Sequence, residues 1–473
     1  MKCQTSMLTS GPYRVGLVLA FLIAASSWLA PSARAADPFA SNNGLYPSPT
    51  EWARPYRTSN FNYPSTAESE WLKRAPRQKL TIANAASYVE ALKTFLEPSL
   101  EAMIDTPDSW RPTEKSWFSM PWTAEISGTD ATSGREAILG SYSGQVIEGN
   151  SFDARLAAAA AGRSLLYTDL TVDIQNHTVI YYDAVAATML RKIWADPFKP
   201  SAREAVFPEG ALVIKAGAVT ATPAQWPVVK DAAIWNVFRP PFKSVNGPPP
   251  ASSAPVVTQL RLLQFDAIVK DTVASPKTGW VFITWVYDAG APGTRPWDRL
   301  VPLGAMWGND PQFASEPEGK DPAGGPLQET WINPKAPSYA VKTLGWGGRL
   351  SGPIDVSLRH GVVLTNGKIL EKGMHASSCL SCHGTSQYPF IANLYPSPNK
   401  IFPQDGKTFL LYPPGSAEWA QWFADRSGAQ AQSAGNDQNA VGLDYDMLLT
   451  FALSNFNDAA GNKALVQAHF RVH

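Results

Sequence analysis

The chain has 473 residues, with 40 basic and 40 acidic side chains and 44% hydrophobic residues. This balance gives no sign of the clustered Lys and Arg that bind nucleic acid or anionic membranes. The 17 Trp, 15 Tyr and 20 Phe exclude disorder over most of the length, and the length exceeds the roughly 250 to 300 residues of a usual single core.

Residues 1–35 have the pattern of a cleaved signal peptide. Lys2 and Arg14 precede or open an apolar run over 15–30, and residues 33–35 have the small-x-small form of a signal-peptidase site. An uncleaved anchor is the alternative, although the run is shorter than the roughly 20 residues of a spanning helix. Cleavage would leave 438 residues with a charge of −3, because three basic residues are lost. We therefore expect a periplasmic protein with no integral membrane segment in the mature chain.

Residues 36–135 are predicted to form an N-terminal arm and a helical region. The stretch 37–76 is rich in Pro, Ser, Asn, Tyr and Trp without a sustained period and predicts an extended arm. Helical spacing of apolar residues predicts a helix over 83–104, capped by Thr81 or Asn84 and bent or broken at Pro98. Two more helices are predicted over 152–166 and 181–194.

The segment 136–344 is predicted to contain a β-rich central domain. Runs of β-branched and aromatic residues bounded by Pro or Gly predict strands over 211–215, 256–270 and 279–287. In the segment 345–473, short strands are predicted over 361–370 and 408–412, and helices over 417–426 and 443–457. The expected fold class is therefore α+β, with N-terminal helices, a β-rich centre and a mixed C-terminal segment.

The only two cysteines outside the leader lie in Cys379-Leu380-Ser381-Cys382-His383. Covalent haem attachment needs two thiols that meet the two vinyl groups and an imidazole that reaches the iron, and this spacing is the c-type attachment signature. The alternatives are a redox-active or structural disulfide and a zinc site, which would need further ligands. The segment 345–473 is therefore the predicted haem-binding segment.

These five residues resemble the attachment site of the c-type cytochromes. The resemblance implies one covalently attached haem c, thioether links at Cys379 and Cys382, an axial iron ligand at His383 and one-electron redox chemistry. The chain departs from the small single-haem members of the family, because residues 361–367 before the motif predict a strand and turn instead of a helix. It is also several times longer than one such domain.

The sixth iron position decides between electron transfer and chemistry on a substrate, because a sixth protein ligand blocks access to the iron. Met447 lies 64 residues after His383, a separation typical of the family's methionine ligand, yet it also falls on an apolar helical stripe typical of core. His360, His375 and Met374 are the other candidates, and an open position without a protein ligand is the remaining alternative.

Further residues are candidates for the surroundings of the haem. Arg349, in a Gly-rich segment, is a candidate partner of a haem propionate, although a surface arginine in a turn is the alternative. Trp419, Trp422 and Phe423 could wall the ring or pack a core. Candidate acid-base groups elsewhere are the aspartates among turn residues, which more often cap turns; they are Asp288, Asp298 and Asp310.

A second resemblance concerns the centre of the chain. Residues 207–215, with the sequence FPEGALVIK, and the Gly279-Trp280 pair before the haem motif resemble the β-sheet haem proteins related to cytochrome c′-beta, which oxidise hydroxylamine or bind nitric oxide. The resemblance implies a haem pocket partly walled by the central sheet and an open iron site.

Three functions follow as hypotheses. The first is an exported, soluble single-haem c-type cytochrome that transfers electrons to or from a periplasmic partner. The second is a haem-dependent oxidoreductase in which a small substrate meets an open iron. The third is a structural or glycan-contacting protein with an accessory haem, suggested by the Trp and Tyr content.

Overall fold

A computed structural model describes the chain over residues 58–123, 141–151, 155, 165–244, 248–314, 327–355, 377–390, 393–398, 411–432 and 439–460, with the backbone of four two-residue strands between 358 and 375. All of these residues belong to one compact unit, Pro38–His473. The signal peptide and the helix predicted over 152–166 lie essentially outside the described residues.

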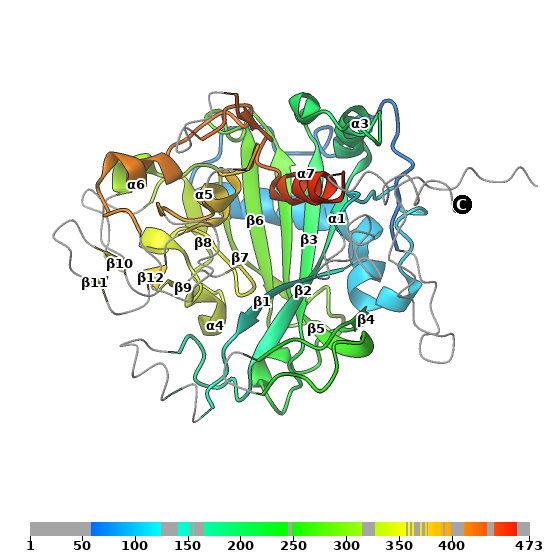
Figure 1. Ribbon diagram of the computed structural model, residues 1–473, viewed down its shortest axis with the longest axis vertical. Helices are drawn as coiled ribbons and strands as arrows, with labels where there is room; N and C mark the ends of the chain where they lie inside the picture. Colours follow the sequence, from blue (N-terminus) through cyan, green and yellow to red (C-terminus); the bar gives the residue numbers. More distant parts are fainter. Residues whose placement is uncertain are drawn as a thin grey trace, which may run out of the picture. The chain divides into compact units, whose positions relative to one another are not determined.

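An antiparallel sheet is the centre of the fold (Figure 1). In the described residues it has eight strands in the order β1-β2-β3-β5-β6-β7-β8, and β4 pairs with the first part of β5. Its strands are β1 (Tyr142–Ile147), β2 (Ile174–Tyr182), β3 (Leu212–Val219), β4 (Ile234–Arg239), β5 (Val256–Lys270), β6 (Trp280–Tyr287), β7 (Leu300–Met306) and β8 (Thr330–Ile332).

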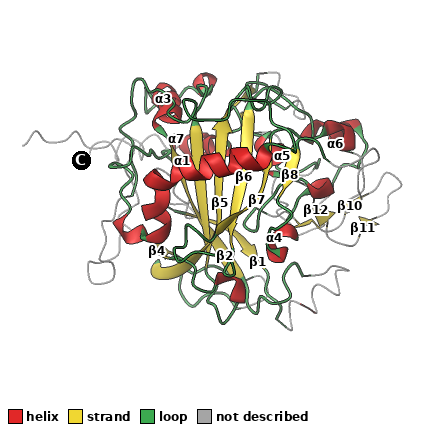
Figure 2. Ribbon diagram, turned by 180° about the vertical axis from the view of Figure 1, so that it is seen from behind, coloured by secondary structure: helices red, strands yellow, loops and turns green. Residues whose placement is uncertain are grey.

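Helix α1 (Ala85–Asp105) covers one face of this sheet (Figure 2). Its buried side chains, which include Leu92 and Leu96, share a hydrophobic cluster with Ile214 of β3, Ala267 of β5 and Ile283 of β6. Pro98 lies within α1, and Asn84 takes the N-cap position. The Asn84 side chain accepts from the backbone N–H of Thr81 instead of from the helix.

The opposite face of the sheet carries the short helices of the C-terminal part and α3 (Figure 1). Helix α3 (Ala184–Ile193) begins after Asp183, whose carboxylate accepts from Ala186 N. Its cluster joins Leu190 to β-sheet residues such as Leu263 and to Leu453 near the C-terminus. The other helices are α4 (Ser338–Val341), α5 (Cys379–His383), α6 (Ala417–Trp422) and α7 (Met447–Ala460).

Short strand pairs tie the C-terminal elements together. The hairpin-like pairs are β10 (Val362–Val363) with β11 (Ile369–Leu370) and β9 (Leu358–Arg359) with β12 (Met374–His375), and β13 (Gln387–Tyr388) pairs with β14 (Val441–Gly442). The last pair connects the chain just after α5 to the chain just before α7. Among the described residues, no helix combines the length and apolarity that crossing a membrane requires.

The α+β class is confirmed, and so are the strands predicted over 256–270 and 279–287 and the helix over 83–104. The helix predicted over 181–194 is wrong at its start, because residues 181–182 end strand β2. The helix predicted over 443–457 begins only at Met447, because Asp444 and Tyr445 adopt left-handed backbone conformations, with φ of 49° and 66°. Residues 408–410 lie outside the described part, and residues 411–412 are loop.

Candidate functional site

A cavity of about 320 Å³ lies against the sheet face opposite α1. Its walls come from β1, β2, β3, β5 and β6, from residues 351–355 and 394–395, and from α5 and α7. The volume falls within the roughly 300 to 1,000 Å³ of ordinary ligand sites. Three residues of the predicted attachment motif, Cys379, Cys382 and His383, line it.

Residues 379–383 form the short helix α5 because Ser378 and Ser381 cap its start. Ser378 accepts from Ser381 N, and the Ser381 side chain accepts from Ser378 N, which together make a capping box. Leu380 is fully buried in the core. Residues three and four apart share a helix face, so Cys379, Cys382 and His383 point to the cavity together while Leu380 anchors the helix.

The imidazole of His383 is held in one orientation. Its Nδ1 lies 2.7 Å from the Tyr445 carbonyl oxygen, and its ring meets the Phe282 ring edge-on with centroids 5.0 Å apart. A carbonyl only accepts, so Nδ1 carries the proton and Nε2 keeps its lone pair. Burial lowers the pKa of His383 to about 4, which keeps the imidazole neutral near pH 7. A neutral, oriented imidazole is the form that ligates a metal.

The two cysteines form no disulfide in the structure, and burial raises the pKa of the Cys379 thiol. No group of three or more His, Cys, Asp and Glu side chains suited to a metal ion occurs in the described part of the chain. Two thiols outside any disulfide and a neutral imidazole lie on one face of one helix, beside the apolar side chains Phe282 and Ile268. This arrangement fits covalently attached haem.

Met447 lines the same cavity from the first position of α7. The residue before it, Asp446, accepts from the Tyr182 hydroxyl at 2.9 Å and from Leu449 N at 3.0 Å, which fixes the start of the helix against strand β2. The structure thus brings Met447 and His383 to one cavity although 64 residues separate them. His360 lies outside the described residues, as do the side chains of Met374 and His375.

Arg349 lies elsewhere, fully buried and absent from the cavity lining. Its guanidinium donates to three backbone carbonyls, those of Trp346, Asn309 and Asp310, at 2.8 to 2.9 Å. It also stands 4.8 Å from the centre of the Phe423 ring. This arginine therefore links its own loop to residues 309–310 and to the end of α6.

Trp419, Trp422 and Phe423 belong to a separate small hydrophobic cluster that also contains Tyr395. Of that cluster's buried members, only Tyr395 is also a cavity residue. The ring of Trp419 packs against Trp346, with centroids 4.7 Å apart. In this structure the three residues pack the region around α6 beside the cavity.

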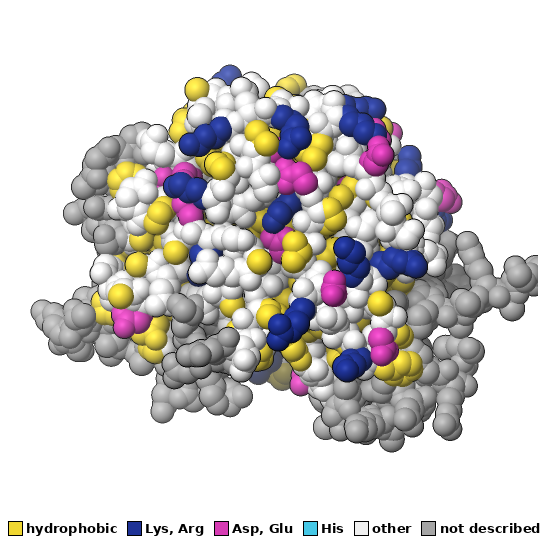
Figure 3. Space-filling view, turned by 90° about the horizontal axis from the view of Figure 1, so that it is seen from above, with side chains coloured by type: hydrophobic (Ala, Val, Ile, Leu, Met, Phe, Trp, Pro, Cys, Tyr) yellow, Lys and Arg dark blue, Asp and Glu magenta, His cyan; other side chains and the backbone are white. Residues whose placement is uncertain are grey.

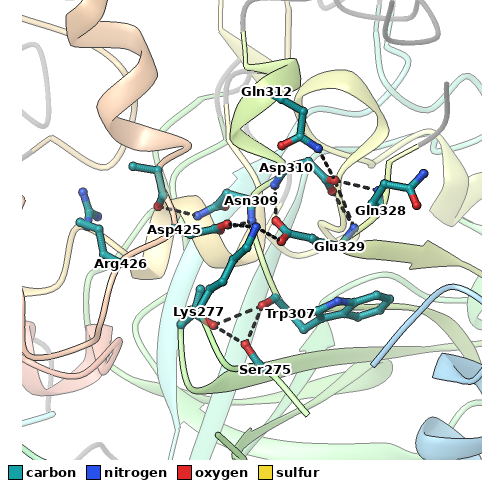
Figure 4. A network of polar contacts seen from close by, with 12 residues as sticks. Ser275, Lys277, Trp307, Asn309, Asp310, Gln312, Gln328, Glu329, Asp425 and Arg426 are labelled. Atoms are coloured by element: carbon teal, nitrogen blue, oxygen red, sulfur yellow. Dashed lines mark hydrogen bonds and ion pairs between the residues drawn. The ribbon is translucent and has the colours of Figure 1, made fainter. Parts of the chain in front are cut away.

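The three aspartates considered for acid-base chemistry hold turns or ion pairs. Asp310 accepts from the backbone N–H groups of Gln328 and Glu329, within the polar network of Figure 4. Asp298 pairs with Arg295, and Asp288 accepts from Gly290 N. None of the three lines the cavity.

The sequence did not single out the polar wall of the cavity. Lys215 of β3, Asp266 of β5 and Thr284 of β6 are direct cross-strand neighbours on the cavity face. The next row toward one end is apolar, with Val213, Ile268 and Phe282. Lys215, the one charged residue in the otherwise apolar strand β3, is the signal that could have pointed to this row.

On the face shown in Figure 3, basic and acidic side chains are interspersed, with no large patch of one sign. Comparisons of the chain with models of protein families, with curated proteins and with solved structures find no match.

Proposed function

We propose that the protein is an exported, soluble c-type cytochrome that holds one haem in this cavity and transfers electrons to or from a periplasmic partner. The observation that carries the proposal is the convergence of both cysteines and an oriented neutral His383 on one cavity. When bound, the haem supplies one-electron redox chemistry. In this proposal Cys379 and Cys382 fix its edge, and His383 ligates the iron from α5.

Met447 is the proposed sixth ligand, because it is the methionine that lines the cavity within the described residues. The start of α7 is held on β2 by Asp446 and Tyr182, so the methionine has a fixed place. Tyr445, whose carbonyl orients His383, lies only two residues before it. The short link couples the positions of the two proposed ligands.

The first experiment tests haem attachment and axial ligation in the full-length protein, exported in a host that matures c-type cytochromes. We expect the wild type to keep its haem stain on a denaturing gel and a Cys379→Ala, Cys382→Ala double variant to lose it. Met447→Ala is expected to turn a low-spin spectrum high-spin and to let the ferrous form bind carbon monoxide. Met189→Leu, on the buried side of α3, is the control and keeps the wild-type spectrum.

Haem stain retained by the double variant would overturn covalent attachment. Unchanged spectra in Met447→Ala would remove the methionine as a ligand.

A second candidate function is a haem oxidoreductase with an open iron site that oxidises or reduces a small substrate. The observation that favours it is the extent of the cavity, which continues from α5 to the polar row of β3, β5 and β6. A high-spin wild-type protein that binds carbon monoxide promptly would favour this function over electron transfer.

A further inference from the structure

A cluster of one cation and two carboxylates, defined by Lys215, Asp266 and Asp355, forms the polar wall of the cavity. The Lys215 ammonium lies 2.9 Å from an Asp266 oxygen and 2.7 Å from an Asp355 oxygen. The side chains of Lys215 and Asp266 are only 19% and 12% exposed. Burying charged groups to this degree costs free energy unless they are paired with opposite charges. Buried, paired ionisable groups of this kind are common at functional sites.

The two carboxylates are held close by the same donors. Besides sharing the ammonium, both accept from the Gln264 amide nitrogen. Asp266 also accepts from the Thr284 hydroxyl at 2.7 Å. The cluster therefore carries two negative charges and one positive charge, and two like charges this close favour binding a proton between them.

Other titratable groups face the same cavity from each element around it. They are Tyr142 of β1, Tyr182 of β2, Cys379, Cys382 and His383 of α5, Tyr395, and Asp446 before α7. Lys215 is the one Lys or Arg side chain among the described residues of the lining. No cation other than Lys215 therefore offsets the two aspartates within this lining.

We propose that the Asp266–Asp355 pair takes up one proton from water for each electron that the haem of the proposed function receives. The inference rests on that function. The electron comes from the redox partner and reduces the iron from ferric to ferrous, while the proton becomes an O–H bond on one of the two carboxylates. The overall change is therefore the gain of one electron and one proton, and reoxidation releases both.

Electrostatics gives the direction of this coupling. An electron added to the haem iron repels the negative charge of the nearby carboxylate pair. The pair therefore binds a proton more tightly in the reduced protein than in the oxidised one. Burial already raises the pKa of Asp266, which brings the pair nearer to protonation. The Asp355 side chain is 35% exposed and gives the proton a route to solvent.

The test is a potentiometric titration of the purified haem-loaded protein at a series of pH values. In the wild type we expect the midpoint potential to fall as pH rises through one window and to be flat on either side. The slope in that window cannot exceed about 59 mV per pH unit, the one-electron equivalent of a tenfold change per unit. Asp355→Asn is expected to abolish the slope. Asp169→Asn, an exposed aspartate outside the cavity, is expected to keep it.

Asp266→Asn is the second variant, used where Asp355→Asn does not fold, and it is also expected to remove the slope. Infrared difference spectra of wild-type reduction should show a protonated carboxyl band that Asp266→Asn or Asp355→Asn removes. A flat potential in the wild type, or a slope kept by the folded variants, overturns the proposal. Failure to attach haem sinks the proposed function instead, so the two failures are distinguishable.

Discussion

At the residue scale, Arg349 is a buried cation held by backbone carbonyls. All three of its guanidinium nitrogens donate to backbone carbonyls, and burial lowers its pKa to about 10. Arg349→Met should remove all three hydrogen bonds, although the Trp346 and Asp310 carbonyls still accept from Arg349 N and Phe313 N. We expect it to lower the free energy of unfolding by about 3 kcal/mol, measured by urea denaturation. Arg349→Lys should recover only part of the lost stability, because an ammonium lacks the planar array of donors with which the guanidinium reaches three carbonyls at once.

Arg77→Met is the matched control, since Arg77 is 41% exposed and makes one surface ion pair with Glu209. Its urea midpoint should stay near that of the wild type. If Arg349→Met instead leaves stability intact and shifts the redox potential, the arginine acts on the cofactor, as the sequence first suggested.

The same scale explains which site residues the sequence could reveal. Cys379, Cys382 and His383 lie within five consecutive residues, so the sequence alone shows their spacing and indicates their chemistry. Lys215 and Asp266 meet only because β3 and β5 pair in one register, and Asp355 joins them from a distant loop. A sequence without alignment does not give register, and this part of the site becomes visible only in the fold.

At the element scale, the position of α5 depends on a close backbone approach at Gly345. Trp346 N donates to Ser377 O, and Cys379 N donates to Leu350 O, so the chain around 345–350 carries the start of α5. A Cβ at Gly345 would come within 1.8 Å of the Ser377 carbonyl oxygen. Gly345→Ala should therefore displace α5 and lower the yield of haem-stained protein and its thermal midpoint together.

Gly348→Ala is the control from the same segment. Its φ is +83°, so an alanine there is strained, but a Cβ would meet nothing within 4 Å. We expect a cost of about 1 kcal/mol and normal haem attachment. Equal losses in the two variants would show that backbone strain, and not the contact with Ser377, governs the segment.

Elements were predictable where one pattern extended over the whole element. All residues of the apolar strand β6 are buried, and the apolar residues of α1 form one buried stripe along the whole helix. The sequence did not predict strand β2. Polar Asn176 and Thr178 face the cavity, so apolar and polar residues do not alternate along the strand as they do where one face packs against a core. Most described tryptophans are buried, so their abundance reflects the thickness of the core on both sides of the sheet.

At the scale of the whole molecule, residues of the three predicted segments share the hydrophobic cluster on the cavity side of the sheet. A single hydrophobic cluster contains Phe61 of the N-terminal arm, Val286 of the sheet and Leu453 of α7. Buried Asp444 adds a polar link between the C-terminal segment and the sheet, because it pairs with Lys270 at 2.7 Å and accepts from Trp280 Nε1 at 2.8 Å. Continuity of this kind favours cooperative unfolding of the parts together.

We therefore expect the mature protein to unfold in one transition. Far-ultraviolet circular dichroism, tryptophan fluorescence and the haem absorption band should give the same urea midpoint. Asp444→Asn should lower all three urea midpoints together. It should lower the free energy of unfolding by about 3 kcal/mol, because the largely buried Lys270 ammonium loses its charged partner. Asp231→Asn, which removes an exposed carboxylate 3.8 Å from Arg299, should leave them unchanged. If the haem band is lost at a lower urea concentration than the sheet signal, the segment 345–473 is an independent domain, as the sequence boundaries predict.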